Sequence, residues 1–186
     1  MPETPRLETD RLILRAASCE DAPAIQKYFN NFNIIRYIGS DVPWPYPEDG
    51  AITFLEHMFK KMEKDEIYLW SIALKSHGNE AIGLIEYRFA DSEDNRGFWL
   101  AEPFWGQGIM PEAVEITQDF VFFELGKDKI IVKNAVSNSQ SSSVKVKAGA
   151  EFLYTQKKNY LSGDNQEEVW QVTAENWSKI RQKHLA

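Results

Sequence analysis

The chain has 186 residues, of which 43% are hydrophobic and 26% are charged, and this composition is ordinary for one folded domain. Its formal net charge of −7 argues against nucleic acid as a partner and favours cationic partners such as amines. Cys19 is the single cysteine, which excludes an intrachain disulfide and leaves no basis for a cysteine-ligated metal. No apolar run approaches the roughly 20 residues of a membrane span, and the N-terminus does not resemble a signal peptide. We therefore expect one cytoplasmic domain over residues 1–186, without a metal and away from membranes.

The first third of the chain predicts one strand and two helices. Leu7–Arg15 alternates apolar and polar residues, which is typical of a strand. Ser18 stands before an acidic pair, as a helix N-cap does, so a helix is expected from there to about Asn30. Ser40–Pro47 holds three prolines between aromatic residues and predicts an irregular loop. Glu48–Lys64 has the apolar spacing of an amphipathic helix.

The middle of the chain predicts a run of strands that leads into a helix. Ile67–Leu74, Ala81–Phe89 and Gly97–Ala101 are strand candidates joined by short polar connections, so consecutive antiparallel hairpins are expected. After a loop, a helix is expected from Pro111 to about Leu125, because proline suits the first helical turn and Gly126 suits the exit.

The last third adds a strand at Lys129–Val136 and a short helix at Ser139–Lys147. Phe152–Tyr160 and Glu167–Thr173 predict a closing hairpin, and Glu175–His184 predicts a final helix. The complete order of elements is that of a mixed α/β domain without a linker.

The segment from Trp99 to Ala113 carries the chemistry. It predicts a strand, a turn with Gly106 and Gly108, and then the start of a helix. Such a turn directs several backbone N–H groups outward at the positive end of a helix, which suits a pyrophosphate. A plain strand-to-helix connection would use the same glycines. No Gly-Lys-Ser/Thr follows and the third glycine of the dinucleotide fingerprint is missing, so two other phosphate-binding loops are excluded.

Four motifs in order resemble the GNAT superfamily of acetyltransferases, and within it the branch of bacterial ribosomal-protein N-terminal acetyltransferases. These motifs are Leu7-Glu-Thr-Asp-Arg-Leu-Ile-Leu-Arg15, Ile82-Gly83 with Gly97-Phe-Trp-Leu100, Glu102-Pro-Phe-Trp-Gly-Gln-Gly-Ile-Met-Pro-Glu-Ala113, and Asn138-Ser-Gln-Ser141 followed by Lys147-Ala-Gly149. The resemblance implies the acyl-CoA N-acyltransferase fold of class α/β (α+β), a mixed and mostly antiparallel sheet flanked by helices. It also implies acetyl-CoA as the co-substrate.

The resemblance assigns cofactor contacts to eight positions. Backbone N–H groups of the loop would hold the pyrophosphate, and Trp105 stands where the superfamily has Gln or Arg. The strand before the loop would pair with the pantetheine arm, and Asn138 would lie near the thioester, although it could equally cap the following helix. The cofactor-binding residues expected are Leu100, Ala101, Gly106, Gln107, Gly108, Ile109, Met110 and Asn138.

Two residues that serve catalysis in many superfamily members are replaced here. Lys145 stands at the position of a tyrosine that protonates the leaving thiolate, and Lys133 stands at that of a glutamate base. Ser141 lies on the same helical face as residues 138 and 145 and is the available acid. Glu86, Glu102 or a water held by such groups could act as the base. The aromatic residues of Trp44-Pro-Tyr-Pro47, with Trp99 and Trp105, could line the acceptor site.

The function expected is N-acetylation by direct attack of a primary amine on acetyl-CoA, the amine belonging to a small molecule or to a protein N-terminus. A homodimer is left open. A non-catalytic acetyl-CoA-binding module is the alternative, because the usual tyrosine and glutamate are missing. A cationic acceptor drawn to an acidic cleft mouth is expected from the net charge and from carboxylates near the site: Glu86, Glu102, Asp91, Glu93 and Asp94.

Overall fold

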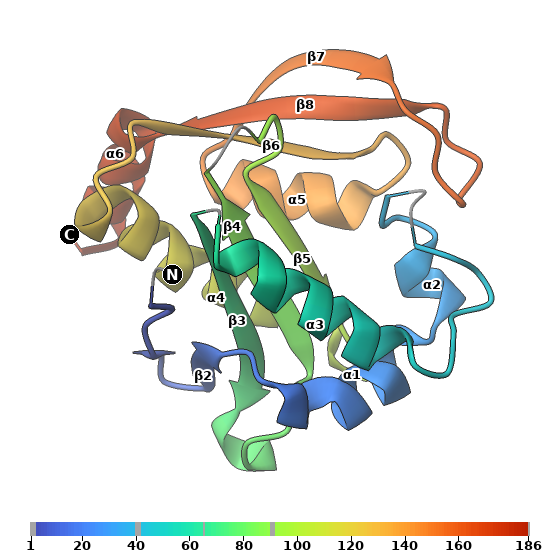
Figure 1. Ribbon diagram of the computed structural model, residues 1–186. Helices are drawn as coiled ribbons and strands as arrows, with labels where there is room; N and C mark the ends of the chain where they lie inside the picture. Colours follow the sequence, from blue (N-terminus) through green and yellow to red (C-terminus); the bar gives the residue numbers. More distant parts are fainter. Residues whose placement is uncertain (1–2, 40–41, 65, 90–91, 186) are drawn as a thin grey trace.

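A computed structural model describes residues 3–39, 42–64, 66–89 and 92–185, which form two antiparallel sheets (Figure 1). The larger sheet has the strand order β1-β2-β3-β4-β5, so each strand pairs with its neighbour in the sequence. The smaller sheet has the order β6-β8-β7. The strands are β1 (Leu7–Glu8), β2 (Leu12–Ala16), β3 (Ile67–Leu74), β4 (Gly83–Arg88), β5 (Arg96–Leu100), β6 (Lys129–Ala135), β7 (Glu151–Lys157) and β8 (Gln166–Thr173).

Helices cover both faces of the larger sheet. In Figure 1 α3 crosses in front of this sheet while α4 lies behind it, and α5 lies below β8. The helices are α1 (Ala22–Phe29), α2 (Phe32–Ile35), α3 (Gly50–Met62), α4 (Ile109–Asp119), α5 (Ser139–Lys147) and α6 (Ala174–Leu185). Short 3-10 turns at Cys19–Asp21, Lys75–His77 and Glu102–Phe104 and a π-helical turn at Phe120–Glu124 complete the list. Within the described ranges no helix is long and apolar enough to cross a bilayer.

The core is built around β3, which is buried along its whole length because helices cover both faces of its sheet. Trp70 in this strand is fully buried, and its ring meets Phe120, from the π-helical turn after α4, and Tyr87, from β4, in edge-to-face contacts. Such a strand is a continuous apolar run. This explains why the sequence predicts its bounds without error.

The two sheets are joined at Asn95, immediately before β5. Its backbone N–H donates to the carbonyl of Ile131 in β6 at 2.7 Å, and its side-chain Oδ1 accepts from the N–H of Ile131, also at 2.7 Å. In the described part of the chain no further hydrogen bond joins β5 to β6. The sheets therefore separate along β5, and the gap between them is where the cavities described below are found.

The expected fold class is confirmed, and so are most of the expected elements. The exceptions have local causes. Leu7–Arg15 is not one strand but a hairpin, because the Thr9 hydroxyl accepts the N–H of Leu12 at 2.9 Å and closes a tight turn. The helix expected from Pro111 begins at Ile109, since Gly108 adopts a left-handed φ of 75° as its N-cap. Pro111 still fits, because the first-turn N–H groups of a helix have no partner within it.

Two further segments need comment, one helix that the sequence did not predict and one loop that is described only in part. The helix α2 was not predicted. It has four residues and depends on the Asn31 side chain, which accepts the N–H of Asn33. The loop expected at Ser40–Pro47 is irregular over residues 42–47, whereas residues 40 and 41 lie outside the described residues.

Candidate functional site

The turn between β5 and α4 presents a series of unpaired backbone donors. Gly106 and Gly108 have φ values of 74° and 75°, a region that side-chain-bearing residues rarely adopt. In the described part of the chain no acceptor is hydrogen-bonded to the N–H groups of residues 106–110. These donors surround the positive end of an 11-residue helix. The turn is therefore suited to a pyrophosphate.

The turn is held from behind by the hairpin at the N-terminus. Arg11 donates from Nη1 to the Gln107 carbonyl at 3.0 Å and from Nε to the Glu112 carboxylate at 2.8 Å. The Thr9 hydroxyl donates to the same carboxylate. Burial alone would raise the pKa of Glu112, but the hydrogen bonds from Thr9 and Arg11 hold this pKa below its usual value. The Thr-Asp-Arg motif thus positions the turn and does not line the groove itself.

A groove of about 470 Å³ runs from this turn along β5 to the first turn of α5. Six of the eight expected cofactor residues line it together, namely Leu100, Gly106, Gly108, Ile109, Met110 and Asn138. Ala101 and Gln107 do not. The N–H of Ala101 is used by the sheet, where it donates to the Ile82 carbonyl at 2.8 Å. The Gln107 side chain donates to the Pro103 carbonyl at 3.0 Å.

Trp105 lies against the free edge of β5. Its indole Nε1 donates to the carbonyl of Leu100 at 2.7 Å. An aromatic ring at this position supplies no charge to an anion. The anion-binding capacity of the turn therefore depends on backbone N–H groups and on the end of the helix.

A second cavity, of about 690 Å³, lies between β5, β6 and the loop before α3. Among the residues suggested for an acceptor site, Tyr46, Pro47 and Trp99 line this cavity, Trp105 lines the first groove, and Trp44 is exposed and lines neither. The two spaces share six residues at their junction, which are Tyr37, Ile38, Phe98, Trp99, Asn138 and Ser141. A group carried in the groove would meet a second molecule at this junction.

Of the expected catalytic residues, Ser141 and Glu86 share the second cavity and Glu102 does not. The Glu102 carboxylate accepts from Asn31 Nδ2 at 2.5 Å and from Asn33 Nδ2 at 3.0 Å, so it ties the start of the turn to α2. Asp91 lies outside the described residues, and Glu93 is an exposed side chain that lines neither space. In the described ranges no group of three or more His, Cys, Asp or Glu side chains is placed to hold a metal ion.

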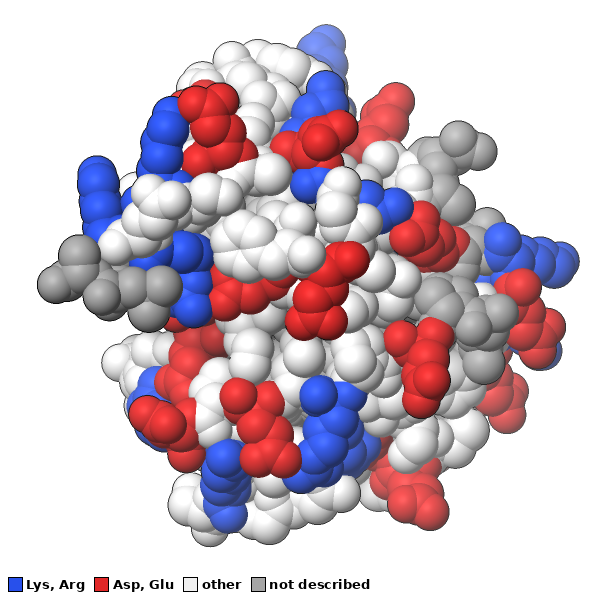
Figure 2. Space-filling view, turned by 90° about the vertical axis from the view of Figure 1, so that its left-hand side faces the viewer, with Lys and Arg blue, Asp and Glu red and all other residues white. Residues whose placement is uncertain are grey.

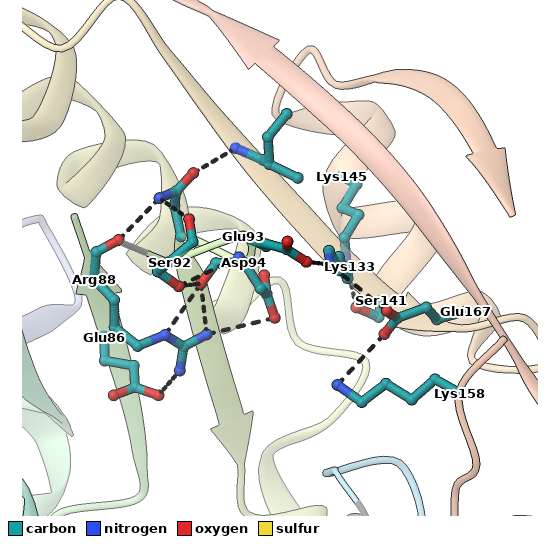
Figure 3. A network of polar contacts seen from close by, with 12 residues as sticks. Glu86, Arg88, Ser92, Glu93, Asp94, Lys133, Ser141, Lys145, Lys158 and Glu167 are labelled. Carbon is teal, nitrogen blue, oxygen red and sulfur yellow. Dashed lines mark hydrogen bonds and ion pairs between the residues drawn. The ribbon is translucent and has the colours of Figure 1, made fainter. Parts of the chain in front are cut away.

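Glu86 lies in the middle of β4, opposite Gly97 of β5. One of its carboxylate oxygens accepts from Arg88, and the other is buried without a hydrogen-bond partner among the described residues (Figure 3). Burial raises the pKa of Glu86, and the neighbouring Arg88 partly opposes this. A Cβ at position 97 would lie 2.7 Å from the Glu86 carboxylate, so glycine there leaves the space that the carboxylate occupies.

Asn138 and Ser141 are fixed at the start of α5. The Asn138 side chain accepts the N–H of Ser141 at 3.1 Å, so it caps the helix while it also lines both spaces. The Ser141 hydroxyl accepts a hydrogen bond of 2.8 Å from the Nζ of Lys145, whose side chain is almost completely buried. The sequence placed Lys145 on the same helical face as Ser141, but it gave this lysine no role beyond its departure from a family pattern. Its spacing of four from Ser141 was the signal that the two side chains meet.

The charge of the second cavity differs from that of the whole chain. Asp94 lines it beside Arg88, but bases outnumber acids among its described lining residues: Arg88, Arg96, Lys133, Lys145 and Lys158 against Asp49, Glu86 and Asp94. On the face of the molecule in Figure 2, acidic and basic side chains are intermingled. The expectation of an acidic cleft mouth is therefore wrong for the described residues.

Known proteins resemble this chain in sequence. The family model described as an acetyltransferase (GNAT) domain matches residues 11–151. The uncharacterized N-acetyltransferase YoaA of Bacillus subtilis strain 168 is 27% identical over 148 residues, which cover 78% of this chain and 82% of that protein.

Two solved structures share the fold. The microcin C7 self-immunity acetyltransferase MccE, in complex with acetyl-CoA and AMP, aligns with a TM-score of 0.72 at 19% identity, over 89% of this chain and 93% of that one. The ribosomal-protein-S5-alanine acetyltransferase of Vibrio fischeri aligns with a TM-score of 0.74 at 20% identity, over 92% and 98%.

Gly108→Val tests the turn as the anion site. Coenzyme A as a probe should raise the melting temperature of the wild type, because a ligand at a hundredfold excess over its Kd adds about 2.7 kcal/mol to folding stability. The shift should be lost in Gly108→Val. Gly126→Val is the matched control, because Gly126 has a similar φ of 65° but lies beyond α4. Both variants should lose about 1–3 kcal/mol of stability from backbone strain. Equal shifts in both variants would remove the turn from the site.

Lys145→Met should stabilise the protein, since burial of a lysine is costly. Burial and the nearby Arg96 lower the pKa of Lys145 from its ordinary 10.5 to about 7 in the folded state. The unfolded state therefore binds more protons between these pH values, and wild-type stability rises with pH across them. The gain in folding stability from methionine should be largest below pH 7, on the order of 1–4 kcal/mol. Each kcal/mol should raise the melting temperature by about 2–4 °C. It should shrink toward pH 10.5. A gain that is independent of pH would contradict the burial argument.

Proposed function

The chain belongs to the acetyltransferase (GNAT) domain family, and on that premise we propose that it transfers the acetyl group of acetyl-CoA directly to a primary amine. One observation carries the proposal. A groove with a turn of free backbone N–H groups at one end meets a second cavity at Asn138 and Ser141. Two molecules that occupy these spaces would meet where a polar hydroxyl and an amide are already in place. This is the arrangement that direct transfer requires.

The groove supports the cofactor half of the proposal. The N–H groups of residues 106–110 would bind the pyrophosphate, and the free edge of β5 at Phe98 and Leu100 would face the pantetheine arm. Asn138 would lie near the thioester. The MccE structure, which has the same fold, is described as a complex with acetyl-CoA and AMP.

Two side chains support the acceptor half. We assign Glu86 the binding and deprotonation of the incoming ammonium, because its unpartnered oxygen is buried in the second cavity. Its raised pKa makes it a stronger base than an ordinary carboxylate. Ser141 lines both spaces, and we assign its hydroxyl the protonation of the leaving thiolate. Glu102 is given no catalytic part.

The charge of the second cavity restricts which classes of amine can act as the acceptor. A space with an apolar wall and more bases than acids is unfavourable for a polyamine. It suits an amine that also carries an anionic or hydrogen-bond-accepting group, which could belong to a small molecule or to the N-terminus of a protein. The ribosomal-protein-S5-alanine acetyltransferase with the same fold supports the protein alternative.

A non-catalytic acetyl-CoA-binding module remains the second candidate, because the tyrosine and glutamate of many superfamily members are replaced by Lys145 and Lys133. Such a module would bind the cofactor and release no thiol. A mixed panel of amines, monitored for free CoA, therefore separates the two functions. We expect N-terminal peptides and acidic amines to release CoA faster than spermidine, by tenfold or more. If no amine releases CoA above the rate of hydrolysis while CoA still binds, the module is the correct function.

Glu86→Gln should lower kcat/KM for the acceptor by about 10²–10⁴-fold, the usual contribution of a general base. The affinity for acetyl-CoA should not change, because Glu86 does not line the groove. Glu102→Gln is the comparison. Its carboxylate accepts hydrogen bonds from Asn31 and Asn33, and Glu102 itself lines neither space, so the exchange should cost stability but change kcat/KM by less than threefold. Steady-state kinetics with both substrates varied measure these quantities. A Glu102 variant that loses more activity than the Glu86 variant would reverse the assignment.

A further inference from the structure

Lys145 is a buried lysine with no carboxylate partner. It lies in α5 with 2% of its surface exposed, and no carboxylate in the described part of the chain is within ion-pair distance of its Nζ. The hydrogen bond from Nζ to the Ser141 hydroxyl is its sole polar contact there. Buried lysines are ordinarily paired, because an unpaired buried charge is costly. A lysine kept in this environment is therefore a candidate for chemistry.

Charged groups from three segments face Lys145. Arg96 in β5 is buried and adds a like charge, while Asp94 before β5 and Glu168 in β8 add opposite charges from beyond ion-pair distance. Arg96 cannot relieve the repulsion by losing a proton, because guanidinium stays protonated. Burial first, and Arg96 second, lower the pKa of Lys145 to about 7. Its proton is therefore exchangeable at neutral pH.

The position of the pair links the two spaces of the site. Lys145 lines the second cavity, and Ser141 lines both that cavity and the groove (Figure 3). The distance of 2.8 Å between Nζ and Oγ is that of a hydrogen bond through which a proton can move. The backbone of Ser141 is also held in place, because its N–H donates to the side-chain oxygen of Asn138. A continuous donor–acceptor path therefore leads from the acceptor cavity to the cofactor groove.

We propose that Lys145 and Ser141 form a proton relay that carries a proton from the acceptor nitrogen to the leaving sulfur. The inference rests on the proposed acetyl transfer. As the amine nitrogen bonds to the acetyl carbon, neutral Lys145 accepts a proton from that nitrogen. As the carbon–sulfur bond breaks, the bond electrons go to sulfur, Ser141 gives its hydroxyl proton to that sulfur, and the Lys145 ammonium replaces the proton on Ser141.

The proton balance of the relay closes on itself. One amine and one thioester give one amide and one thiol, and Lys145 begins and ends neutral. Before the attack, the acceptor ammonium gives one proton to Glu86, and Glu86 then releases that proton to solvent. Because the relay starts from neutral Lys145, kcat should rise with pH through about 7 and then stay level. An acid whose proton stays bound until pH 10, as in a tyrosine, would give no rise there.

Four variants, three single and one double, test the relay. Lys145→Met removes the amine, and Lys145→Arg keeps a hydrogen-bond donor to Ser141 but cannot release its proton at neutral pH. We expect both variants to lose about 10²–10⁴-fold in kcat and to lose the rise near pH 7. Ser141→Ala should lose a similar factor, and Ser141→Ala combined with Lys145→Met should lose little more, because the two residues act as one unit.

A direct measurement accompanies the kinetics. The Cε signal of Lys145 in protein made with labelled lysine, identified by its absence in Lys145→Met, should titrate near pH 7 in the free protein. Titration near pH 10, or a Lys145→Arg variant with the wild-type kcat and pH profile, would overturn the relay. These results are distinct from failure of the acetyl transfer itself, in which the wild type would release no CoA with any amine. Failure of acetyl transfer in the wild type would overturn the relay as well.

Discussion

The site depends on one constraint, which is that hydrogen bonds between the two sheets are confined to Asn95 in the described part of the chain. Its two hydrogen bonds with Ile131 hold β5 against β6 at the start of β5 and leave the rest of that strand unpaired on one edge. An unpaired strand edge is normally a liability, because it offers free N–H and C=O groups to other chains. Here the edge faces a groove that α4 and α5 close from either side. The same separation that leaves this edge of β5 unpaired opens the groove and the second cavity.

The floor of the second cavity holds buried polar groups that lower the stability of the fold. Glu86, Arg96 and Asn134 each have a buried polar atom without a hydrogen-bond partner in the described part of the chain, and Lys145 has no counter-ion there. Each such group destabilises the fold relative to an apolar residue of the same shape. Four of the five side chains with such an atom among the described residues line this one cavity, Arg36 being the exception, and none lies in β3. This distribution indicates that the charges serve a bound molecule, because an internal scaffold would be better served by apolar packing.

The sequence predicted what local patterns determine. The apolar run at β3, the serine-rich helix α5 and the glycine turn before α4 are set by neighbours in the chain, so their positions followed from residue types alone. The family resemblance to GNAT acetyltransferases is confirmed by the family match and by the fold. The expected members of the groove also came together, except Ala101 and Gln107. Whether those residues bind the cofactor stays a prediction that depends on a bound complex.

The sequence failed where distant segments decide the environment. Glu86 and Glu102 are equivalent in the sequence, but one meets Gly97 across a strand pair and the other meets Asn31 and Asn33 from a helix that was not predicted. The hydrogen bond from Arg11 to the Glu112 carboxylate, which holds the glycine turn, joins residues that are 101 positions apart. The net charge of −7 and the nearby carboxylates predicted an acidic cleft mouth, whereas the fold places Arg96, Lys133 and Lys145 around the second cavity. Sums over a composition do not report which charges a cavity collects.

The position of the cofactor sulfur is the measurement that tests this account most directly. A crystal structure with coenzyme A should place the pyrophosphate on the N–H groups of residues 106–110. The sulfur should lie at the junction of the two spaces, within about 3.5 Å of the Ser141 hydroxyl. A sulfur that lies outside the junction, with Ser141 and Lys145 still hydrogen-bonded to each other and apart from the ligand, would contradict the proposed path of the acetyl group.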